Sequence, residues 1–185
     1  LDSVPYLGKL SPMMNFALEN FDHPEALKAV CSIAFITKQN VTYAATQVLT
    51  RLKNNSGTDI EDESVDSAMR FAAISSITLY LSKCPDIAPI FHELLHTLFE
   101  LLKDHQTGFR NADLEVATIE AINSLHSYSS ELIKPFIPQL VQNVYICINL
   151  LTTIEDDEYT CDVRLSMIAV IMEEIRLLIA HGALE

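Results

Sequence analysis

The sequence predicts an all-α fold built from amphipathic helices, and three observations indicate it. Apolar residues recur at three- and four-residue spacing in successive segments, which is typical of helices that bury one face. Only 4 Gly and 7 Pro occur among 185 residues, whereas a β-sandwich or barrel needs turn residues about every 8–12 positions. Hydrophobic residues make up 49% of the chain, enough to build a core and to exclude disorder as its overall state.

Polar breaks divide the chain into its expected helices. They fall at residues 20–23, 38–40, 54–63, 83–86, 103–111, 127–134 and 152–162. The apolar segments between them predict helices over 11–20, 24–37, 42–53, 64–82, 86–103, 112–128, 134–151 and 162–180. Two prolines open the fifth helix and two open the seventh, at positions 85, 89, 135 and 138. Proline is tolerated in a first turn, because the N–H that it lacks would be unpaired there anyway.

The helices recur as pairs. The second helix of each pair carries Ala or Val followed by an aliphatic residue, at Ala29-Val30, Ala73-Ile74, Ala121-Ile122 and Val170-Ile171. An apolar residue stands three positions before each of these aliphatic residues. Another stands three positions after it in every copy except the last, which has Glu174. A period of about 40–50 residues is typical of stacked helix pairs that cover one another. We expect one helical-repeat domain over 1–185, with repeats at 11–40, 41–84, 85–131 and 132–182.

Short patterns at the helix starts make the chain resemble the HEAT-repeat family. Pro89 and Pro138 stand in the first helix of a pair, whereas Asp113-Leu114-Glu115-Val116 and Asp162-Val163-Arg164 open the second. The resemblance implies a right-handed α-α superhelix of about four antiparallel pairs, cut from a longer scaffold. The chain is loosely similar to importin-β-type nuclear transport receptors. This similarity implies a role in protein transport and a location in the cytoplasm or nucleus. Armadillo repeats, other paired-helix arrays and an ordinary helical bundle fit the same periodicity.

Acidic residues gather in the turns inside the predicted pairs. Lys and Arg total 12 against 25 Asp and Glu, a formal net charge of −13, which argues against nucleic acid and anionic membranes as partners. Stacking would align the turns as an acidic edge that attracts a basic peptide or domain. Its candidate residues are Asp59, Glu61, Asp62, Glu63, Asp113, Glu115, Glu155, Asp156, Asp157 and Glu158. The alternative interpretation is that these acids are solvated or complement helix dipoles.

The segment 92–96 reads His-Glu-Leu-Leu-His and matches the zincin motif, in which two His bind zinc and the Glu polarises water. Glu115 follows His96 by a spacing similar to that of the third ligand in gluzincin metallopeptidases. A zinc hydrolase using His92, Glu93, His96 and Glu115 is therefore the alternative function. Against it, a helical wheel places His92 and His96 on the polar face, and no strand is predicted to cover the helix. The apolar stripe of that helix comprises Ile87, Phe91, Leu94, Leu95, Leu98 and Leu102.

The four cysteines, Cys31, Cys84, Cys147 and Cys161, are far apart and form no CxxC pair. Most lie inside apolar helical patterns, which indicates reduced thiols of an intracellular protein. No segment is apolar for long enough to span a bilayer. An N-terminal cluster is a second candidate for docking, because Met-rich surfaces repack around partners. It comprises Tyr6, Met13, Met14, Phe16 and Phe21. The alternative is that these residues belong to the core, which is the more common place for such side chains.

These patterns predict a non-catalytic protein-interaction scaffold with no cofactor. The partner is expected to be basic, bound at the acidic edge or along the second helices. The zinc hydrolase remains the alternative, and a structural domain that only oligomerises is a third class.

Overall fold

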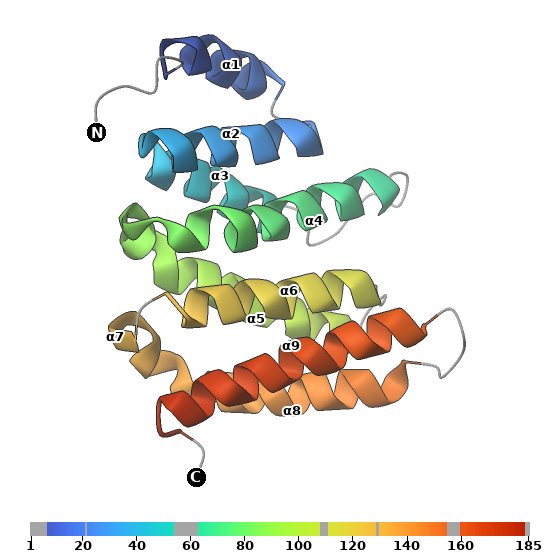
Figure 1. The fold of residues 1–185 in the computed structure, drawn as a ribbon. Helices are drawn as coiled ribbons and strands as arrows, with labels where there is room; N and C mark the ends of the chain where they lie inside the picture. The colour runs from blue at the N-terminus through green and yellow to red at the C-terminus, as the bar shows by residue number, and fades with distance from the viewer. Residues whose placement is uncertain are drawn as a thin grey trace. The chain divides into compact units, whose positions relative to one another are not determined.

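The computed structural model describes residues 7–20, 22–53, 63–107, 111–128, 130–154 and 160–183, and Figure 1 shows its helices. These residues form helices and turns and contain no strand, which confirms the all-α prediction. The α-helices are α1 (Leu7–Glu19), α2 (Pro24–Thr37), α3 (Val41–Lys53), α4 (Glu63–Leu79), α5 (Phe91–Thr107), α6 (Ala112–His126), α7 (Ser130–Ile133), α8 (Ile137–Thr153) and α9 (Cys161–Ala180). Short 3-10 helices occupy Leu81–Lys83 (η2), Pro85–Ile90 (η3) and Lys134–Phe136 (η4).

The helix ends follow the predicted ones closely, with corrections at the prolines. Residues 85–90, expected to begin the fifth α-helix, form η3 instead, and α5 starts at Phe91. Pro89 lies inside η3 and donates no backbone hydrogen bond there. The seventh predicted helix likewise begins as η4, and the unpredicted short helix α7 precedes it. α1 begins four residues earlier than predicted, and α5 continues four residues beyond its predicted end, to Thr107.

The turn from α2 to α3 uses left-handed backbone at two residues. Lys38 caps α2 with a φ of 56°, and Asn40 has a φ of 57° just before α3. Asparagine tolerates this region better than most residues, whereas lysine does so only at a cost. The Lys38 ammonium lies 4.1 Å from the centroid of the Phe35 ring, a cation–π contact that offsets part of that cost.

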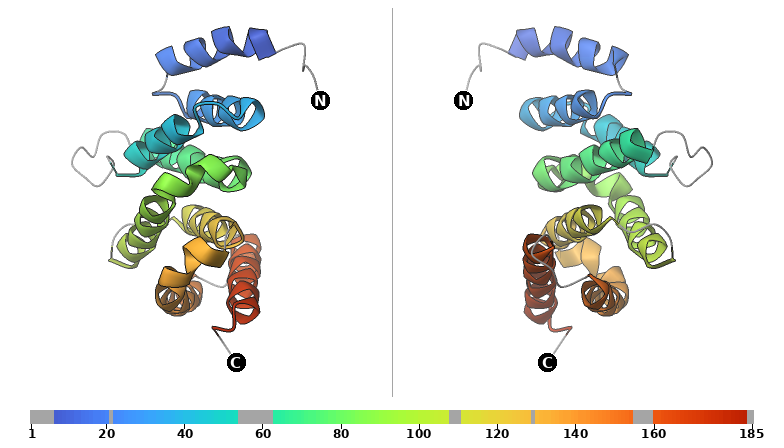
Figure 2. Two further views of the ribbon diagram at one scale, coloured as in Figure 1. Left: turned by 90° about the vertical axis from the view of Figure 1, so that its left-hand side faces the viewer. Right: turned by 90° about the vertical axis from the view of Figure 1, so that its right-hand side faces the viewer.

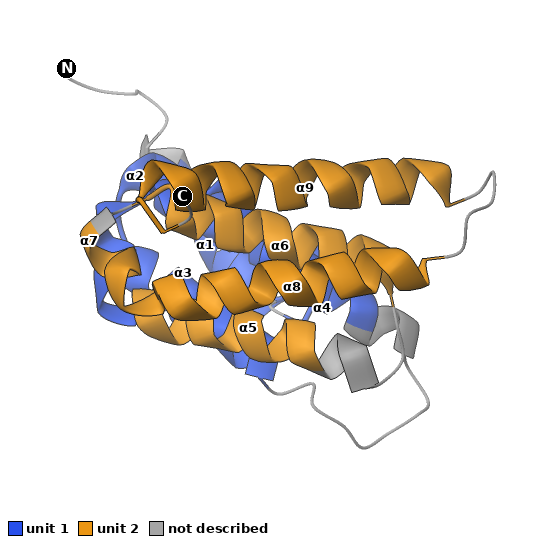
Figure 3. Ribbon diagram, turned by 90° about the horizontal axis from the view of Figure 1, so that it is seen from below, with its two compact units in different colours: residues 1–90 blue, residues 91–185 orange. Residues whose placement is uncertain are grey.

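The chain divides into two compact units, residues 1–90 and 91–185 (Figure 3). The sequence predicted one domain, and the division falls six residues after the predicted boundary between the second and third repeats. In the first unit α2 packs against α1, α3 and α4, and α3 packs against α4 and η3. Its core side chains are fully buried and include Leu27, Val30, Val48, Ile74 and Ile77.

The second unit places α6 and α8 against both α5 and α9, as the two views of Figure 2 show. The predicted apolar stripe, which runs from Ile87 in η3 of the first unit to Leu102 in α5 of the second, is buried throughout, and this confirms the helical-wheel assignment. The aligned repeat positions are less uniform. Phe71 and Ile168 are exposed, whereas Leu27 and Ile119 at the same repeat position are buried. No helix in the described ranges is long and apolar enough to cross a membrane.

Candidate functional site

The predicted acidic edge is described only in part. The residues Asp59, Glu61, Asp62, Glu155, Asp156, Asp157 and Glu158 lie outside the described residues. Glu63 is the first residue of α4, and Asp113 is exposed in the first turn of α6. Glu115 is fully buried, so its assignment to an exposed edge is wrong. It stands four and seven residues before the core residues Ile119 and Ile122, a spacing that places it on the inner face of the helix.

The alternative zinc ligands are not brought together. His92, Glu93 and His96 are exposed on α5. The His92 ring contacts the Phe136 ring edge to face, with the two ring centroids 5.0 Å apart. Glu115 is enclosed in the core of the same unit. Across the described ranges, no three His, Cys, Asp or Glu side chains form a group that could hold a metal ion. The spacing along the chain suggested a ligand set that the packing of α5 and α6 does not assemble.

A buried polar cluster lies instead between α6 and α9. His126 Nδ1 and Glu174 Oε1 are 2.7 Å apart, and the two side chains are 0% and 4% exposed. One turn earlier on α6, the Asn123 side-chain amide donates to the backbone carbonyl of Val170 at 2.8 Å. These links join the two helices through polar groups inside a mostly apolar core, which makes each group costly to leave unpaired.

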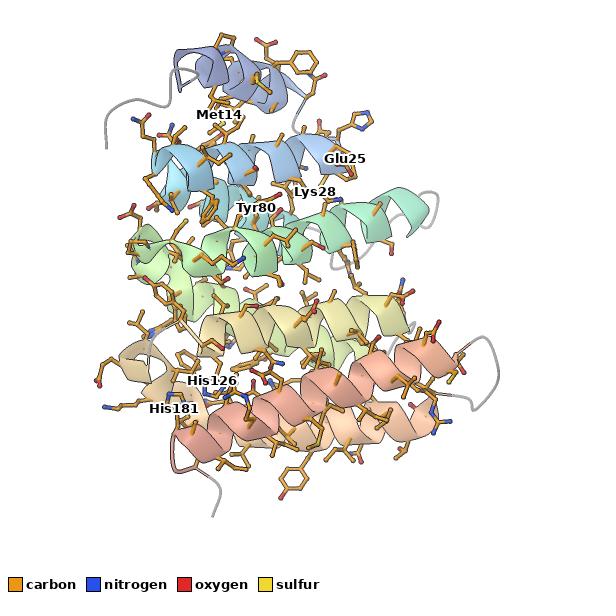
Figure 4. The ribbon with its side chains drawn as sticks, in the orientation of Figure 1. Met14, Glu25, Lys28, Tyr80, His126 and His181 are labelled. Carbon is orange, nitrogen blue, oxygen red and sulfur yellow. The ribbon has the colours of Figure 1, made fainter. Side chains whose placement is uncertain are left out.

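His181, just after α9, extends the cluster toward solvent. Figure 4 shows its ring beside that of His126, with His126 Nε2 and His181 Nδ1 3.2 Å apart. His181 Nδ1 also lies 2.9 Å from the carbonyl oxygen of Leu177. One set of tautomers satisfies all three contacts. His181 Nδ1–H donates to His126 Nε2 and to the carbonyl oxygen of Leu177, and His126 Nδ1–H donates to Glu174.

A small cavity borders this cluster. About 10 Å³ is open to the centre of a water molecule, among side chains that include Asn143, Cys147 and Glu174. Asn143 Nδ2 and Glu174 Oε2 are buried and have no hydrogen-bond partner. The volume of the cavity and the two unpaired polar atoms fit a single bound water, and the volume is too small for a substrate.

Burial raises the pKa of the Cys147 thiol, which also lines this cavity, to about 12, and the nearby carboxyls of Glu174 and Glu115 raise it further. The thiol is therefore no nucleophile at neutral pH.

Alkaline pH is expected to destabilise both units through their buried thiols. Burial raises the pKa of Cys31 to about 12 as well, from an ordinary 9.0. Above pH 9 the unfolded chain loses these thiol protons while the folded chain keeps them until about pH 12. Unfolding is thereby favoured by about 1.4 kcal/mol per thiol at pH 10, with no effect below pH 8. Urea denaturation at pH 8 and pH 10 measures the loss.

The matched comparison for that experiment uses Cys147→Val and Cys161→Ser. Cys147→Val should reduce the difference in the free energy of unfolding between pH 8 and pH 10 by the contribution of one thiol. Cys161→Ser should leave the difference unchanged, because Cys161 is exposed. Equal pH dependence in the wild type and in Cys147→Val would contradict the assignment.

An open apolar groove lies between α1 and α2 in the first unit. It measures about 580 Å³, and Met13, Phe16, Ala17, Ala29 and Ile33 contribute to its lining. Met14 and Ala17 are buried where α1 contacts α2, and Figure 4 shows Met14 between the two helices. By contrast, Met13 is 58% exposed and Phe16 68% exposed. The N-terminal cluster therefore contributes two residues to an exposed apolar wall, while Tyr6 and Phe21 lie outside the described residues.

Acidic groups dominate the end of this groove where α1 gives way to α2. Glu25 lines the groove, and Glu19 and Asp22 are exposed nearby in the chain. Lys28 forms an ion pair with Glu25 at 3.0 Å and is the only Lys or Arg between residues 12 and 33. The Glu25 side chain is nevertheless 82% exposed. Asp22 is paired as well, with Arg51 at 2.7 Å, although its side chain is 92% exposed. Three carboxylates against two cations leave these side chains with a net charge of −1.

Comparison with known proteins adds no relative: the chain matches no protein-family model, no curated protein and no solved structure. The HEAT-repeat resemblance therefore stays a prediction.

Proposed function

We propose that this chain is a non-catalytic protein-binding module whose groove between α1 and α2 receives an amphipathic helix with a basic flank. The observation that carries the proposal is the exposure of Met13 and Phe16, which form an apolar wall on an otherwise acidic segment. Single exposed apolar side chains are ordinary, but contiguous apolar patches mark interaction sites, and Met13 and Phe16 line the same groove. Met13 and Phe16 are spaced to face the same side of α1.

The floor of the groove favours a helix as the occupant. Ala17, Ala26 and Ala29 are small, so the backbone of a bound helix can approach α1 and α2 closely. Such a ligand would place its apolar face against Met13 and Phe16, in the manner of a helix in a groove. Lys or Arg on its flank would meet Glu19, Asp22 and Glu25, which speeds association at low ionic strength.

The wider assignment is part of the same proposal. In both units the second helix of one predicted pair packs against the second helix of the next, α2 against α4 and α6 against α9. This packing supports a HEAT-like scaffold, and a role resembling that of an importin-β-type receptor for basic cargo is consistent with it. Asp113 would contribute to binding at the acidic edge.

Two synthetic peptides of about five helical turns test the groove. Both carry Leu at helical spacing on one face, and the other face carries Lys in the first peptide and Glu in the second. Titration calorimetry should show binding of the Lys peptide and not of the Glu peptide. Added salt should weaken binding, because it screens the exposed charges. A wild-type chain that binds neither peptide would contradict the proposal.

The matched variants for this experiment are Phe16→Ser and Phe71→Ser. Both remove an exposed phenylalanine, 68% and 43% exposed, but only Phe16 lines the groove. Phe16→Ser should weaken binding by about tenfold or more, as expected for a central aromatic contact. Phe71→Ser should bind as the wild type does. Equal affinities of both variants would place the peptide elsewhere.

A further inference from the structure

The exposed large apolar residues of the second unit are confined to two helices. In the described part of residues 91–185, all of them lie on α8 or α9. They are Tyr145, Ile148, Leu165, Ile168, Met172 and Ile179. α8 and α9 pack against each other and run antiparallel (Figure 1). An apolar surface concentrated in this way indicates a face that another molecule covers.

The four residues on α9 form one stripe, which we call the α9 stripe. At about 100° per residue, Leu165, Ile168, Met172 and Ile179 fall within a sector of about 60°. The buried side chains of α9, which run from Met167 to Leu178, occupy the opposite side. The stripe therefore faces away from the core, and its seven-residue spacing from Leu165 to Met172 to Ile179 is typical of helices that pack lengthwise on another helix.

The charges near this face are few, and those of one ion pair on it cancel. α8 has no charged residue from Ile137 to Thr153. On α9, Glu173 and Arg176 neutralise each other through hydrogen bonds of 2.6 and 2.8 Å. A charged partner would gain little here from electrostatic attraction. A second copy of the same acidic chain, with a net charge of −13, would meet a neutral face and little local repulsion.

We propose that the chain forms a two-fold symmetric dimer in which the α9 stripes of two copies pack antiparallel. The spacing of the stripe suits this symmetry, because Leu165 and Ile179 are equally far from Met172 along the chain. A two-fold axis at Met172 brings Met172 against its own copy, Leu165 against Ile179 of the partner subunit, and Ile168 against the aliphatic stem of Arg176 of the partner subunit, as an isologous interface requires. Ala169 is exposed beside the stripe and small enough to let the two helices approach closely. The dimer uses the second unit, so it does not depend on the groove in the first.

Sedimentation equilibrium over a range of concentrations tests the oligomeric state. The wild type should approach twice the mass of the 20.7-kDa chain, and Met172→Glu should remain monomeric. Ile36→Glu is the matched control, because Ile36 is 53% exposed and Met172 is 58% exposed, but Ile36 lies in the first unit. The control should dimerise as the wild type does. Circular dichroism checks that each variant is folded. A monomeric wild type, or a dimer that survives Met172→Glu, would overturn the proposal.

Disulfide trapping tests the geometry, in a chain whose exposed Cys161 is replaced by serine. The remaining native cysteines are buried. Met172→Cys should crosslink to itself, because residues at the axis come within the Cα separation of about 4.4–6.8 Å that a disulfide spans. Leu165→Cys should crosslink with Ile179→Cys when the two proteins are mixed, and neither should crosslink with itself. Efficient self-crosslinking of Leu165→Cys would overturn the antiparallel arrangement.

Discussion

Replacing Glu174 with alanine is expected to lower the free energy of unfolding by about 3 kcal/mol, because it leaves a buried donor unpaired and removes buried side-chain volume from the core. Glu174 is the partner of His126 Nδ1 at 2.7 Å, and both side chains are buried. The truncation would leave the imidazole N–H without an acceptor and would enlarge the small cavity beside Asn143. Urea denaturation of the wild type and the variant measures the difference.

The adjacent residue on α9 provides the control. Glu173 forms an ion pair with Arg176 at 2.6 Å, and the two side chains are 44% and 63% exposed. Glu173→Ala should cost less than about 1 kcal/mol, because exposed ion pairs contribute little. Glu174→Gln should cost less than Glu174→Ala, because the amide oxygen still accepts from His126. Similar losses for Glu173→Ala and Glu174→Ala would show that burial of the pair does not control stability.

The second large effect is expected for Ile122→Ala, at about 2–5 kcal/mol. Ile122 is 2% exposed in the middle of α6 and lines the cavity with residues of α5, α8 and α9. Its truncation removes contacts to three other helices at once, and the surrounding side chains cannot all move inward to fill the space. Amide hydrogen exchange of α6 and α9, together with urea denaturation, reports the loss.

The comparison variant is Ile36→Ala, which removes an exposed isoleucine from α2. Its effect should lie within about 0.5 kcal/mol of zero, as for ordinary surface positions. A cost below about 1 kcal/mol for Ile122→Ala would contradict the central place in the core that both the repeat alignment and the structure give this residue.

Most of the fold could be predicted from the sequence because the helices bury one continuous apolar face each. α2 has the predicted bounds, and the stripe that ends at Leu102 is buried as the helical wheel required. The errors lie where local backbone chemistry competes with periodicity. Pro85 and Pro89 were expected to open an α-helix, but the segment that holds them is a 3-10 helix. Periodicity alone does not separate the two kinds of helix over a segment of six residues.

The candidate site was harder to predict because its groups come from distant parts of the chain. No sequence motif marks His126, although it lies fully buried against a carboxylate 48 residues further on. The sequence did contain a signal. Glu174 interrupts the repeat pattern at a position that the other copies fill with an aliphatic residue. A carboxylate at a core position needs a buried partner, and this requirement could have directed attention to His126. The exposure of Met13 and Phe16 depends on tertiary packing, which periodicity does not report.

The polar links between α6 and α9 also decide how far α9 can slide. Apolar helix surfaces interlock again after a shift of one turn, about 5.4 Å, because their ridges repeat every few residues. Such a shift would part Asn123 from Val170 and His126 from Glu174 together. Each buried polar group left unpaired costs about 1–3 kcal/mol. The two links therefore admit one register of α9 on α6, and the outward direction of the α9 stripe is fixed by an amide and an imidazole inside the core.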